Sequence, residues 1–383
     1  MNRFSNKFKL CDVADIIVGG DKPKKFSINK SNLNNIPVFA NSEKKMGLCG
    51  YTNKARITKP AVTIAARGTV GFVALRKEPY FPTVRLVSLI PKSAKLDVNY
   101  LYYYLKLYRQ TGIGSNQPQI TIPYISSRKI SLPSLHSQQT ISNVLSSLDK
   151  KIEINNRINI ELETVAKLIY DFWFVQYEFP NEHGKPYKSS GGIMVYNQDL
   201  KKEIPQGWTS SYIGELLEKD LSKNKILKKN YQKKGIIPVI DQGLDFISGY
   251  TNDKSALIAT DVPRIIFGDH TRVLKLINFD FARGADGTKS LLSKNKNVPQ
   301  HFFYHSLLKI DLSNYGYSRH FKFLKKFQIV VPALEISREF EKMTNIIYSQ
   351  IKKNLFENIE LEKLRDWLLP MLMNGQITIS EAS

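Results

Sequence analysis

The chain repeats itself at a distance of about half its length. The sequence Gly-Tyr-Thr-Asn at residues 50–53 recurs at residues 249–252, and Asn-Ile-Glu-Leu-Glu at residues 159–163 recurs at residues 358–362. Both recurrences have the same offset, 199 residues, in a chain of 383. Solenoid repeats have periods of about 20 to 50 residues. The offset therefore indicates one duplicated domain with its following segment, not an array of small repeats.

The sequence pattern changes once within each half. Short β-rich runs separated by Gly, Pro and Asn turns occupy residues 7–131, and the same texture returns over residues 208–331. One short helix is expected in the first of these globules, from Val98 to Tyr108. Each globule is followed by a proline and then by a stretch almost free of Pro and Gly. This predicts one long helix over residues 136–174 and another over residues 335–373.

Apolar residues in these two segments are spaced by threes and fours, as the seam of a helix requires. A helix of this length spans about 60 Å, so we expect the two helices to pack on each other. An antiparallel order would place the two globules at opposite ends. The predicted stripes are Ile141, Val144, Leu148, Ile152, Leu162, Val165, Ile169 and Phe172, and Phe340, Met343, Ile347, Ile351, Leu361, Leu364, Leu368 and Met371.

Asparagine interrupts both stripes at matching places, Asn155 in the first and Asn354 in the second. A polar pair inside an apolar seam can fix the register of two helices. We therefore expect the two amides to meet face to face, with chance polar positions as the alternative.

These patterns predict an α+β fold. Two mostly β domains are separated by two long antiparallel helices that form a coiled coil, and a pseudo-two-fold internal duplication relates the halves. The expected boundaries are a first β domain at 1–133, a central helix at 134–179, a breaker-rich linker at 180–207, a second β domain at 208–332 and a C-terminal helix at 333–376.

Charge and composition narrow the class of partner. Lys and Arg number 56 against 34 Asp and Glu, a formal net charge of +22, which favours a polyanion. The chain has no apolar run long enough for a membrane span and no secretory leader at its start, so a cytoplasmic protein is expected. Its two cysteines, Cys11 and Cys49, exclude a disulfide framework and are expected to be buried.

No catalytic or metal motif is evident. The sequence contains no Pro-Pro pair for an amino-methyltransferase loop, and residues 284–290 have too few residues between their glycines for a phosphate-binding loop. His301 and His305 lack further zinc ligands and favour a structural or DNA-facing role. Asp241, Asp245 and Asp269 could be imagined as a nuclease metal site, but turn chemistry explains them more simply. We expect no catalytic residue and no metal ligand.

The chain resembles the specificity (S) subunit of type I restriction-modification enzymes over essentially its whole length. Several segments carry this resemblance together: Ile329-Val330-Val331-Pro332, Ile130-Ser131-Leu132-Pro133 with Gln138-Gln139, Ile204-Pro205-Gln206-Gly207-Trp208, residues 174–180, residues 267–272, residues 284–289 and residues 316–322. The first globule departs from the family pattern, with Ala66-Arg67-Gly68-Thr69-Val70-Gly71 in the corresponding turn. A different target sequence is the natural explanation.

The resemblance implies a non-catalytic, DNA-binding subunit. Each target recognition domain would read one half of a bipartite site in double-stranded DNA, and the helices would fix the spacing and dock two modification (methyltransferase) subunits. No cofactor is implied for this chain, since S-adenosylmethionine would belong to the modification subunits. Restriction (endonuclease and translocase) subunits would join them, and no membrane is implied. The alternative is a self-contained DNA methyltransferase or nuclease with unrecognised motifs, and a structural coiled-coil adaptor is a further rival.

Direct readout of bases needs Arg or Lys at guanine and Asn or Gln at adenine. Our candidates for DNA binding are polar residues in predicted turns, although any one cation can simply be solvated and Tyr51 can equally pack in the core. They are Lys44, Tyr51, Arg67, Gln117 and Gln119 in the first domain, and Lys254, His270, Arg272, Lys289, Arg319 and His320 in the second.

Overall fold

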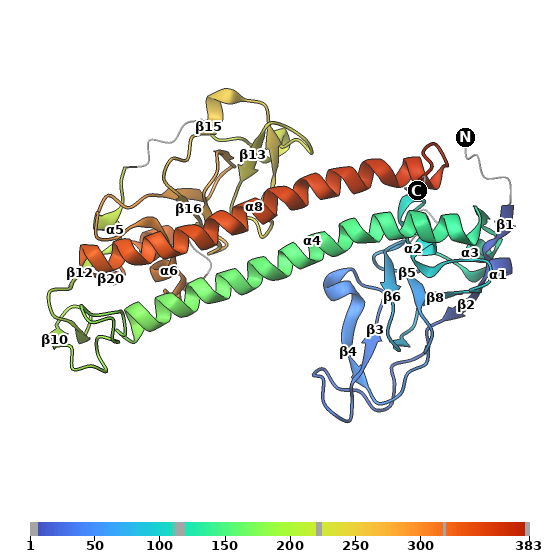
Figure 1. The fold of residues 1–383 in the computed structure, drawn as a ribbon, viewed down its shortest axis with the longest axis horizontal. Coiled ribbons are helices and arrows are strands. Elements are labelled where there is room, and N and C mark those ends of the chain that lie inside the picture. The colour runs from blue at the N-terminus through green and yellow to red at the C-terminus, as the bar shows by residue number, and fades with distance from the viewer. Residues whose placement is uncertain (1–6, 110, 112–118, 220–223, 317–318, 380–383) are drawn as a thin grey trace. The chain divides into compact units, whose positions relative to one another are not determined.

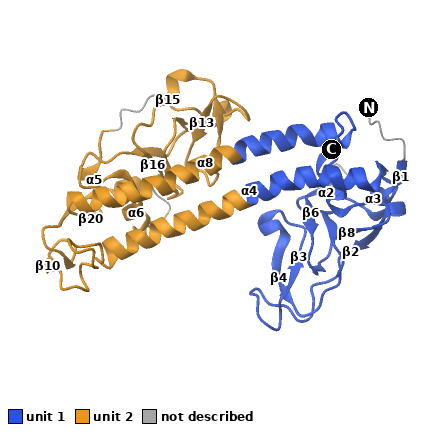
Figure 2. Cartoon of the chain, viewed as in Figure 1, with its two compact units in different colours: residues 1–153, 358–383 blue, residues 154–357 orange. Residues whose placement is uncertain are grey.

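The computed structural model describes residues 7–109, 111, 119–219, 224–316 and 319–379. The chain forms two compact units, residues 1–153 with 358–383 (unit 1) and residues 154–357 (unit 2), as Figure 2 shows. Each unit therefore combines one β-rich domain with portions of both long helices.

The described part of unit 1 contains a sheet of order β2-β8-β5-β6, a sheet of order β4-β3-β7 and the short pair β1-β9 (Figure 1). Strand β5 lies between β8 and β6, and all five of its residues, Ala-Val-Thr-Ile-Ala, are buried, as a central strand requires. The strands are β1 (Lys7–Lys9), β2 (Ala14–Val18), β3 (Ile36–Phe39), β4 (Leu48–Thr52), β5 (Ala61–Ala65), β6 (Val73–Arg76), β7 (Phe81–Pro82), β8 (Leu86–Pro91) and β9 (Lys129–Ser131).

The helices of the first β-rich domain are short. They are α1 (Leu10–Val13), η1 (Lys44–Gly47), α2 (Val98–Leu107) and α3 (Ile122–Ser127). Helix α2 confirms the helix expected after residue 97, and the side chain of Asp97 caps it by accepting a hydrogen bond from the Tyr100 amide at 2.8 Å. Both cysteines are exposed, so their predicted burial is wrong. Cys49 lies on edge strand β4, where its thiol lies 3.3 Å from the Val38 carbonyl of β3 and stays exposed.

Unit 2 repeats this plan. Strand β13 pairs antiparallel with β14 and parallel with β18, as β3 pairs with β4 and β7. Strand β16 lies between β17 and β19, as β5 lies between β6 and β8. The strands are β12 (Thr209–Tyr212), β13 (Ile237–Ile240), β14 (Gly249–Thr251), β15 (Leu257–Ile258), β16 (Arg264–Gly268), β17 (Leu274–Ile277), β18 (Phe281–Arg283), β19 (Thr288–Leu291) and β20 (Gln328–Val331); the helices are α5 (Ile213–Leu216), η3 (Lys228–Asn230), η4 (Lys254–Ala256), α6 (Gln300–Leu308) and α7 (Phe321–Leu324).

The two long helices are α4 (Leu135–Tyr170), which continues in the π-helical turn η2 (Asp171–Val175), and α8 (Leu334–Met373). They confirm both predicted helices. In unit 2 the amide of Asn155 donates to Glu357 Oε2 at 2.7 Å, and that of Asn354 donates to Asn159 Oδ1 at 2.8 Å. Residue numbers rise along one helix as they fall along the other, so the pair is antiparallel.

The hydrogen bonds of the two asparagines differ from the direct pair that we predicted. Each amide reaches a polar residue of the opposite helix, because the register sets Asn155 and Asn354 about one turn apart. The predicted stripes also need correction, since Val165, Phe172, Met343 and Leu364 are exposed. Ala166, Trp173 and Thr344, next to the first three, are buried, as is Leu369 farther along α8, so the buried face of each helix is rotated from the predicted one.

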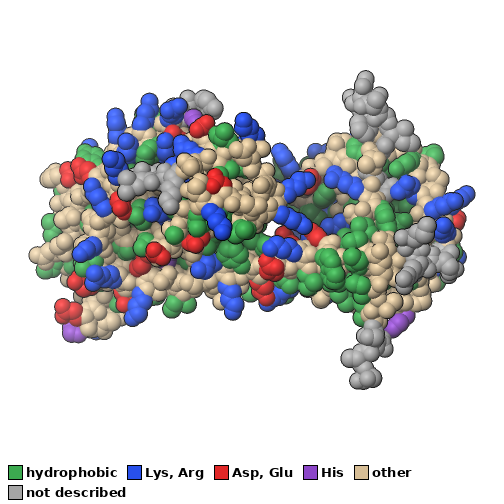
Figure 3. Space-filling model, turned by 90° about the horizontal axis from the view of Figure 1, so that it is seen from above, with side chains coloured by type: hydrophobic (Ala, Val, Ile, Leu, Met, Phe, Trp, Pro, Cys, Tyr) green, Lys and Arg blue, Asp and Glu red, His purple; other side chains and the backbone are tan. Residues whose placement is uncertain are grey.

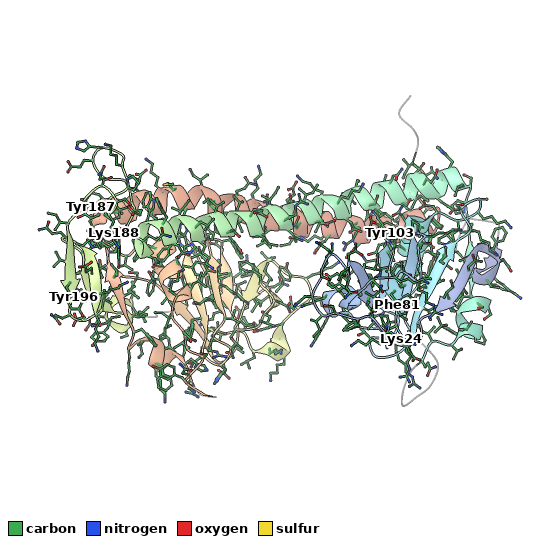
Figure 4. The ribbon with its side chains drawn as sticks, turned by 90° about the horizontal axis from the view of Figure 1, so that it is seen from below. Lys24, Phe81, Tyr103, Tyr187, Lys188 and Tyr196 are labelled. Atoms are coloured by element: carbon green, nitrogen blue, oxygen red, sulfur yellow. The ribbon has the colours of Figure 1, made fainter. Side chains whose placement is uncertain are left out.

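Each core contains helix residues from both halves of the sequence. In unit 1, Leu372 and Met373 of α8 join Leu101 of the first β-rich domain. Tyr103, which Figure 4 shows beside the helix pair, donates its hydroxyl to Asp149 at 2.7 Å, and Arg365 of α8 donates to the same carboxylate at 2.8 Å. In unit 2, Phe174 packs edge-on against Phe302 and Phe340, with ring centroids 4.7 and 5.1 Å away.

The segment predicted as a linker contains a hairpin of β10 (Met194–Asn197) and β11 (Lys202–Pro205). Aromatic stacking attaches the segment to the second β-rich domain, because Phe179 lies between Tyr187 and Trp208 with ring centroids 4.6 and 5.0 Å away. Figure 4 labels Tyr187, Lys188 and Tyr196 on this segment.

Two histidines of α6 face helix α8 inside unit 2. His301 Nδ1 lies 2.9 Å from Thr344 Oγ1, and His305 Nε2 lies 2.9 Å from the Tyr348 hydroxyl. Burial lowers the pKa of His301 to about 4 and that of His305 to about 3. Burial raises the pKa of the neighbouring Glu341 to about 7. The effect of pH on stability through this carboxyl is therefore opposite to that through the histidines. Both histidines have a structural role, which is one of the two roles that we expected for them.

The buried histidines predict an acid-sensitive contribution to stability. The folded state keeps His305 neutral while the unfolded state protonates it below about pH 6.5, so its contribution is present above that pH and is lost as the pH falls toward 3. The loss should be about 1.4 kcal/mol per pH unit. We expect H305Q to be less stable than the wild type at pH 7.5, with the difference narrowing by pH 5 in thermal or urea unfolding. A difference that does not change with pH would contradict this assignment.

Candidate nucleic-acid interface

The loops at one end of the central strands in unit 2 are tied together by Asp269, which directly follows β16. Its backbone amide donates to Gly287 at 2.7 Å, and its backbone carbonyl accepts from the His320 amide at 2.8 Å. Its carboxylate accepts from the Phe321 amide at 2.8 Å and lies 4.0 Å from the Lys289 ammonium. One buried acidic residue therefore brings three distant turns to a single place.

Gln242 connects a fourth loop, the one between β13 and β14. Its side chain accepts from the His270 amide at 3.1 Å and donates to the Asp286 carbonyl at 2.9 Å. Gly287 is required beside it, because its φ is +82° and a Cβ there would lie 2.5 Å from Gln242 Nε2 and 2.8 Å from the His270 ring. We call the loops at residues 241–248, 269–272, 284–287 and 319–321 the unit 2 loop cluster.

The unit 2 loop cluster gathers most of the predicted DNA-binding residues of the second domain. His270 and Arg272 lie on its second loop, Lys289 follows the third, and Arg319 is exposed on the fourth. Arg272 is exposed and donates to the Leu312 carbonyl at 3.3 Å. His320 is only 3% exposed and acts in the cluster through its backbone. Lys254 lies outside these loops, in η4, where Asp253 caps the turn through the Ser255 amide.

Unit 1 uses the same backbone plan with different side chains. The Ala66 amide donates to the Arg85 carbonyl at 3.0 Å, and the Ala66 carbonyl accepts from Ile120 at 3.0 Å, as Asp269 does with Gly287 and His320. Asn41 takes the place of Gln242 and donates to the Arg67 carbonyl at 2.9 Å. We call the loops at residues 40–47, 66–71, 83–85 and 119–120 the unit 1 loop cluster.

The structure brings Arg67 and Gln119 together, with Arg67 Nε donating to Gln119 Oε1 at 2.8 Å. Lys44 is exposed on the first loop of the cluster. Tyr51 is half-buried in β4 and exchanges backbone hydrogen bonds with Ser27. Gln117 lies outside the described residues.

Two buried cations that the candidate set omitted position the first loop of each cluster. Arg76 of β6 donates to the Met46 carbonyl at 2.6 Å and lies over the Phe39 ring at 3.6 Å. Lys275 of β17 donates to the carbonyls of Asp241, at 2.9 Å, and Asp245. Burial lowers the pKa of Arg76 to about 10 and also lowers that of Lys275. The two cations are not at equivalent positions, since Arg76 lies opposite Ala61 and Lys275 opposite Ile266, so the repeat in the sequence does not identify them.

The aspartates considered as a nuclease site belong to turns. Asp241 accepts from the Gly243 amide at 2.8 Å and from the Ser248 and Tyr231 hydroxyls. These hydrogen bonds outweigh its burial and lower its pKa. Within the described part of the chain, no group of three or more His, Cys, Asp and Glu side chains is placed to hold a metal ion.

Charge alone does not delimit the interface. In the face that Figure 3 shows, Lys and Arg side chains are spread over the surface and are not confined to one patch. No helix among the described residues has both the length and the apolar character that crossing a membrane requires. The loop clusters are therefore defined by their hydrogen bonds and their exposed cations.

A family model decides the family of this duplicated fold. The model described as the type I restriction modification DNA specificity domain matches residues 4–164 and again residues 205–363, which together make up more than half of the chain. The chain belongs to the type I restriction modification DNA specificity family. The specificity domain is thus present twice, and each match includes one β-rich domain and much of the helix that follows it.

Specificity subunits from several organisms are similar to this chain. The specificity subunit of type I restriction enzyme MjaIX from Methanocaldococcus jannaschii is 26% identical over 352 residues, 84% of this chain and 79% of that protein. The HindI specificity subunit of Haemophilus influenzae is 24% identical over 347 residues, 72% of this chain and 74% of that protein. A putative type I specificity subunit from Mycoplasma pneumoniae is 37% identical over 142 residues, 37% of this chain and 39% of that protein.

A solved structure has the same fold. The S subunit of a type I restriction-modification system from M. genitalium matches with a TM-score of 0.64 and 17% identity, covering 100% of this chain and 98% of that one.

The loop clusters predict separable losses of DNA affinity. We expect R67A and R319A each to weaken binding by the chain with its modification partners. Loss of a phosphate contact should act on all sequences and reduce the slope of log affinity against log salt by about 0.9, whereas loss of a base contact should cost about 1 to 3 kcal/mol on one sequence only. Fluorescence anisotropy over a salt series measures both quantities. The matched control is K188A. If R67A or R319A binds DNA as K188A does, the substituted arginine is not part of the interface.

Proposed function

We propose that this chain is the sequence-specific DNA-recognition subunit of a type I restriction-modification complex. Each β-rich domain reads one half of a bipartite site, and the antiparallel helices set the distance between the halves. The observation that carries the proposal is the repeated specificity domain with a loop cluster in each copy. The side chains differ between the copies, half-buried Arg67 and Gln119 against half-buried His270 and exposed Arg319, which suits two different half-sites.

The chain has no catalytic role in this proposal. Modification subunits bind S-adenosylmethionine and transfer the methyl group, while this chain selects the DNA. Restriction subunits complete the complex. The direct test incubates the purified chain alone with S-adenosylmethionine and DNA. We expect no methyl transfer until modification subunits are added, and transfer by the chain alone would favour a self-contained methyltransferase.

A duplicated apolar surface on the helices supports docking of two copies of one partner. Val165 and Leu168 of α4 are 45% and 60% exposed, and Leu364 and Trp367 of α8, each 199 positions later, are 43% and 54% exposed. Each pair is spaced i, i+3 and so lies on one helix face. Large exposed apolar side chains that recur at equivalent positions are typical of protein interfaces. We call these pairs the α4 patch and the α8 patch.

The two patches predict the stoichiometry of the complex. A buried charge without a partner is costly, so we expect L168E and W367E each to remove one modification subunit, and the double variant to remove both. Native mass spectrometry of the assembled complex measures the change from two bound subunits to one or none. I346E is the matched control, because Ile346 is 74% exposed but its equivalent in the first half is Ser147. Unchanged assembly in the double variant would exclude the patches as docking sites.

The duplication also predicts modular specificity. Replacing residues 1–131 with the corresponding part of a relative should change one half of the recognised site and leave the other half and the spacing intact. Genome-wide mapping of methylated sites, with the native and the exchanged chain, gives both halves in one experiment. A change in both half-sites would contradict modular recognition.

A further inference from the structure

Arg85 occupies a backbone conformation that arginine rarely adopts. It lies in the turn between β7 and β8, where the Leu86 amide donates to the Thr83 carbonyl at 3.1 Å, and its φ is +69°. The third position of such a turn normally carries glycine, because a side chain there is strained by its own Cβ. The fold therefore tolerates an arginine at a position where glycine would be more favourable.

The second half of the chain has glycine at the corresponding place. Gly287, with φ +82°, accepts from the Asp269 amide as Arg85 accepts from the Ala66 amide, and each of the two residues directly precedes its strand, β19 or β8. The two copies of the domain thus share the turn but differ in its strained residue. Strained residues that persist in a fold are concentrated at functional sites.

The side chain of Arg85 has no evident structural role. It is exposed, and among the described residues no hydrogen bond or ion pair is recorded for its guanidinium. Its backbone carbonyl is bonded to Ala66, the residue before Arg67, so Arg85 belongs to the unit 1 loop cluster beside a predicted DNA-binding residue. Figure 4 places Phe81, on the strand that leads into this turn, farther from the helix pair than Tyr103 is.

We propose that Arg85 is a DNA-contacting residue of the first recognition domain. Its guanidinium binds a pair of acceptor atoms in the half-site that unit 1 reads, either on a phosphate or on the edge of a guanine. Arginine recognises both through two parallel hydrogen bonds. This inference rests on the proposed function. It adds Arg85 to the DNA-binding candidates of the first domain, whose sequence departs from the family pattern.

The test exploits the left-handed backbone. R85G removes the side chain and also relieves the strain, so a loss of DNA affinity cannot be attributed to unfolding if the melting temperature is unchanged or higher. K201G is the matched control, because Lys201 is also an exposed cation with positive φ, +51°, but lies in the β10–β11 turn. Both variants lose one positive charge and one strained residue.

We expect R85G, assembled with modification subunits, to bind the complete site about 5- to 150-fold more weakly than the wild type. K201G should bind like the wild type. When the half-site of unit 1 is scrambled, R85G and the wild type should bind equally if the contact is with guanine. R85K separates the two sources, because it keeps the charge but not the paired donors. If R85K keeps the affinity and the salt slope of the wild type, Arg85 contacts a phosphate. If R85K no longer discriminates between bases at one base pair, Arg85 contacts guanine.

Two results would overturn the inference. Unchanged affinity in R85G would remove Arg85 from the interface, and a melting temperature several degrees lower would give it a structural role. Neither result affects the proposed function, which fails if the wild-type complex itself shows no preference for a bipartite site.

Discussion

The packing of each long helix against the β-rich domain of the other half of the chain is the interaction on which the rest of the structure depends. Leu369, Leu372 and Met373 of α8 lie in the core of unit 1, and Tyr170, Trp173 and Phe174 from the end of α4 lie in the core of unit 2. Burial of such side chains contributes about 1.5 to 3 kcal/mol each. Neither half can therefore bury its apolar surface alone, and the two halves are stable together.

Polar contacts along the helices add specificity to this apolar packing. Asn155 with Glu357, Asn354 with Asn159 and Arg365 with Asp149 join α4 to α8 at successive levels. Shifting one helix by a turn would leave these partly buried groups without partners, at about 1 to 3 kcal/mol each. Within each unit, these contacts fix the register of the two helices against each other.

The loop clusters show how one backbone plan can carry two different sets of side chains. The hydrogen bonds that close each cluster come mostly from the backbone or from buried residues, such as Asp269 with Gly287 and Ala66 with Arg85. The other side chains of the clusters are thereby free to differ, as His270 and Arg67 do. Arg76 and Lys275 perform the same task from inside, since each holds the carbonyls of a loop from a buried strand. The residues that form the framework of each cluster therefore differ from those that vary between the two copies.

The sequence by itself determined the duplication, both long helices, the short helix after residue 97 and the family, because these depend on periodicity, spacing and local motifs. It also pointed to the turns that carry Arg67, His270 and Arg272. Only the tertiary structure decided which helix face is buried and how the two asparagines are paired. It also showed that Arg76 and Lys275 hold the loop clusters and that Arg85 belongs to one of them. The physical reason is that these features depend on hydrogen bonds and packing between segments far apart in the chain, which no local pattern records.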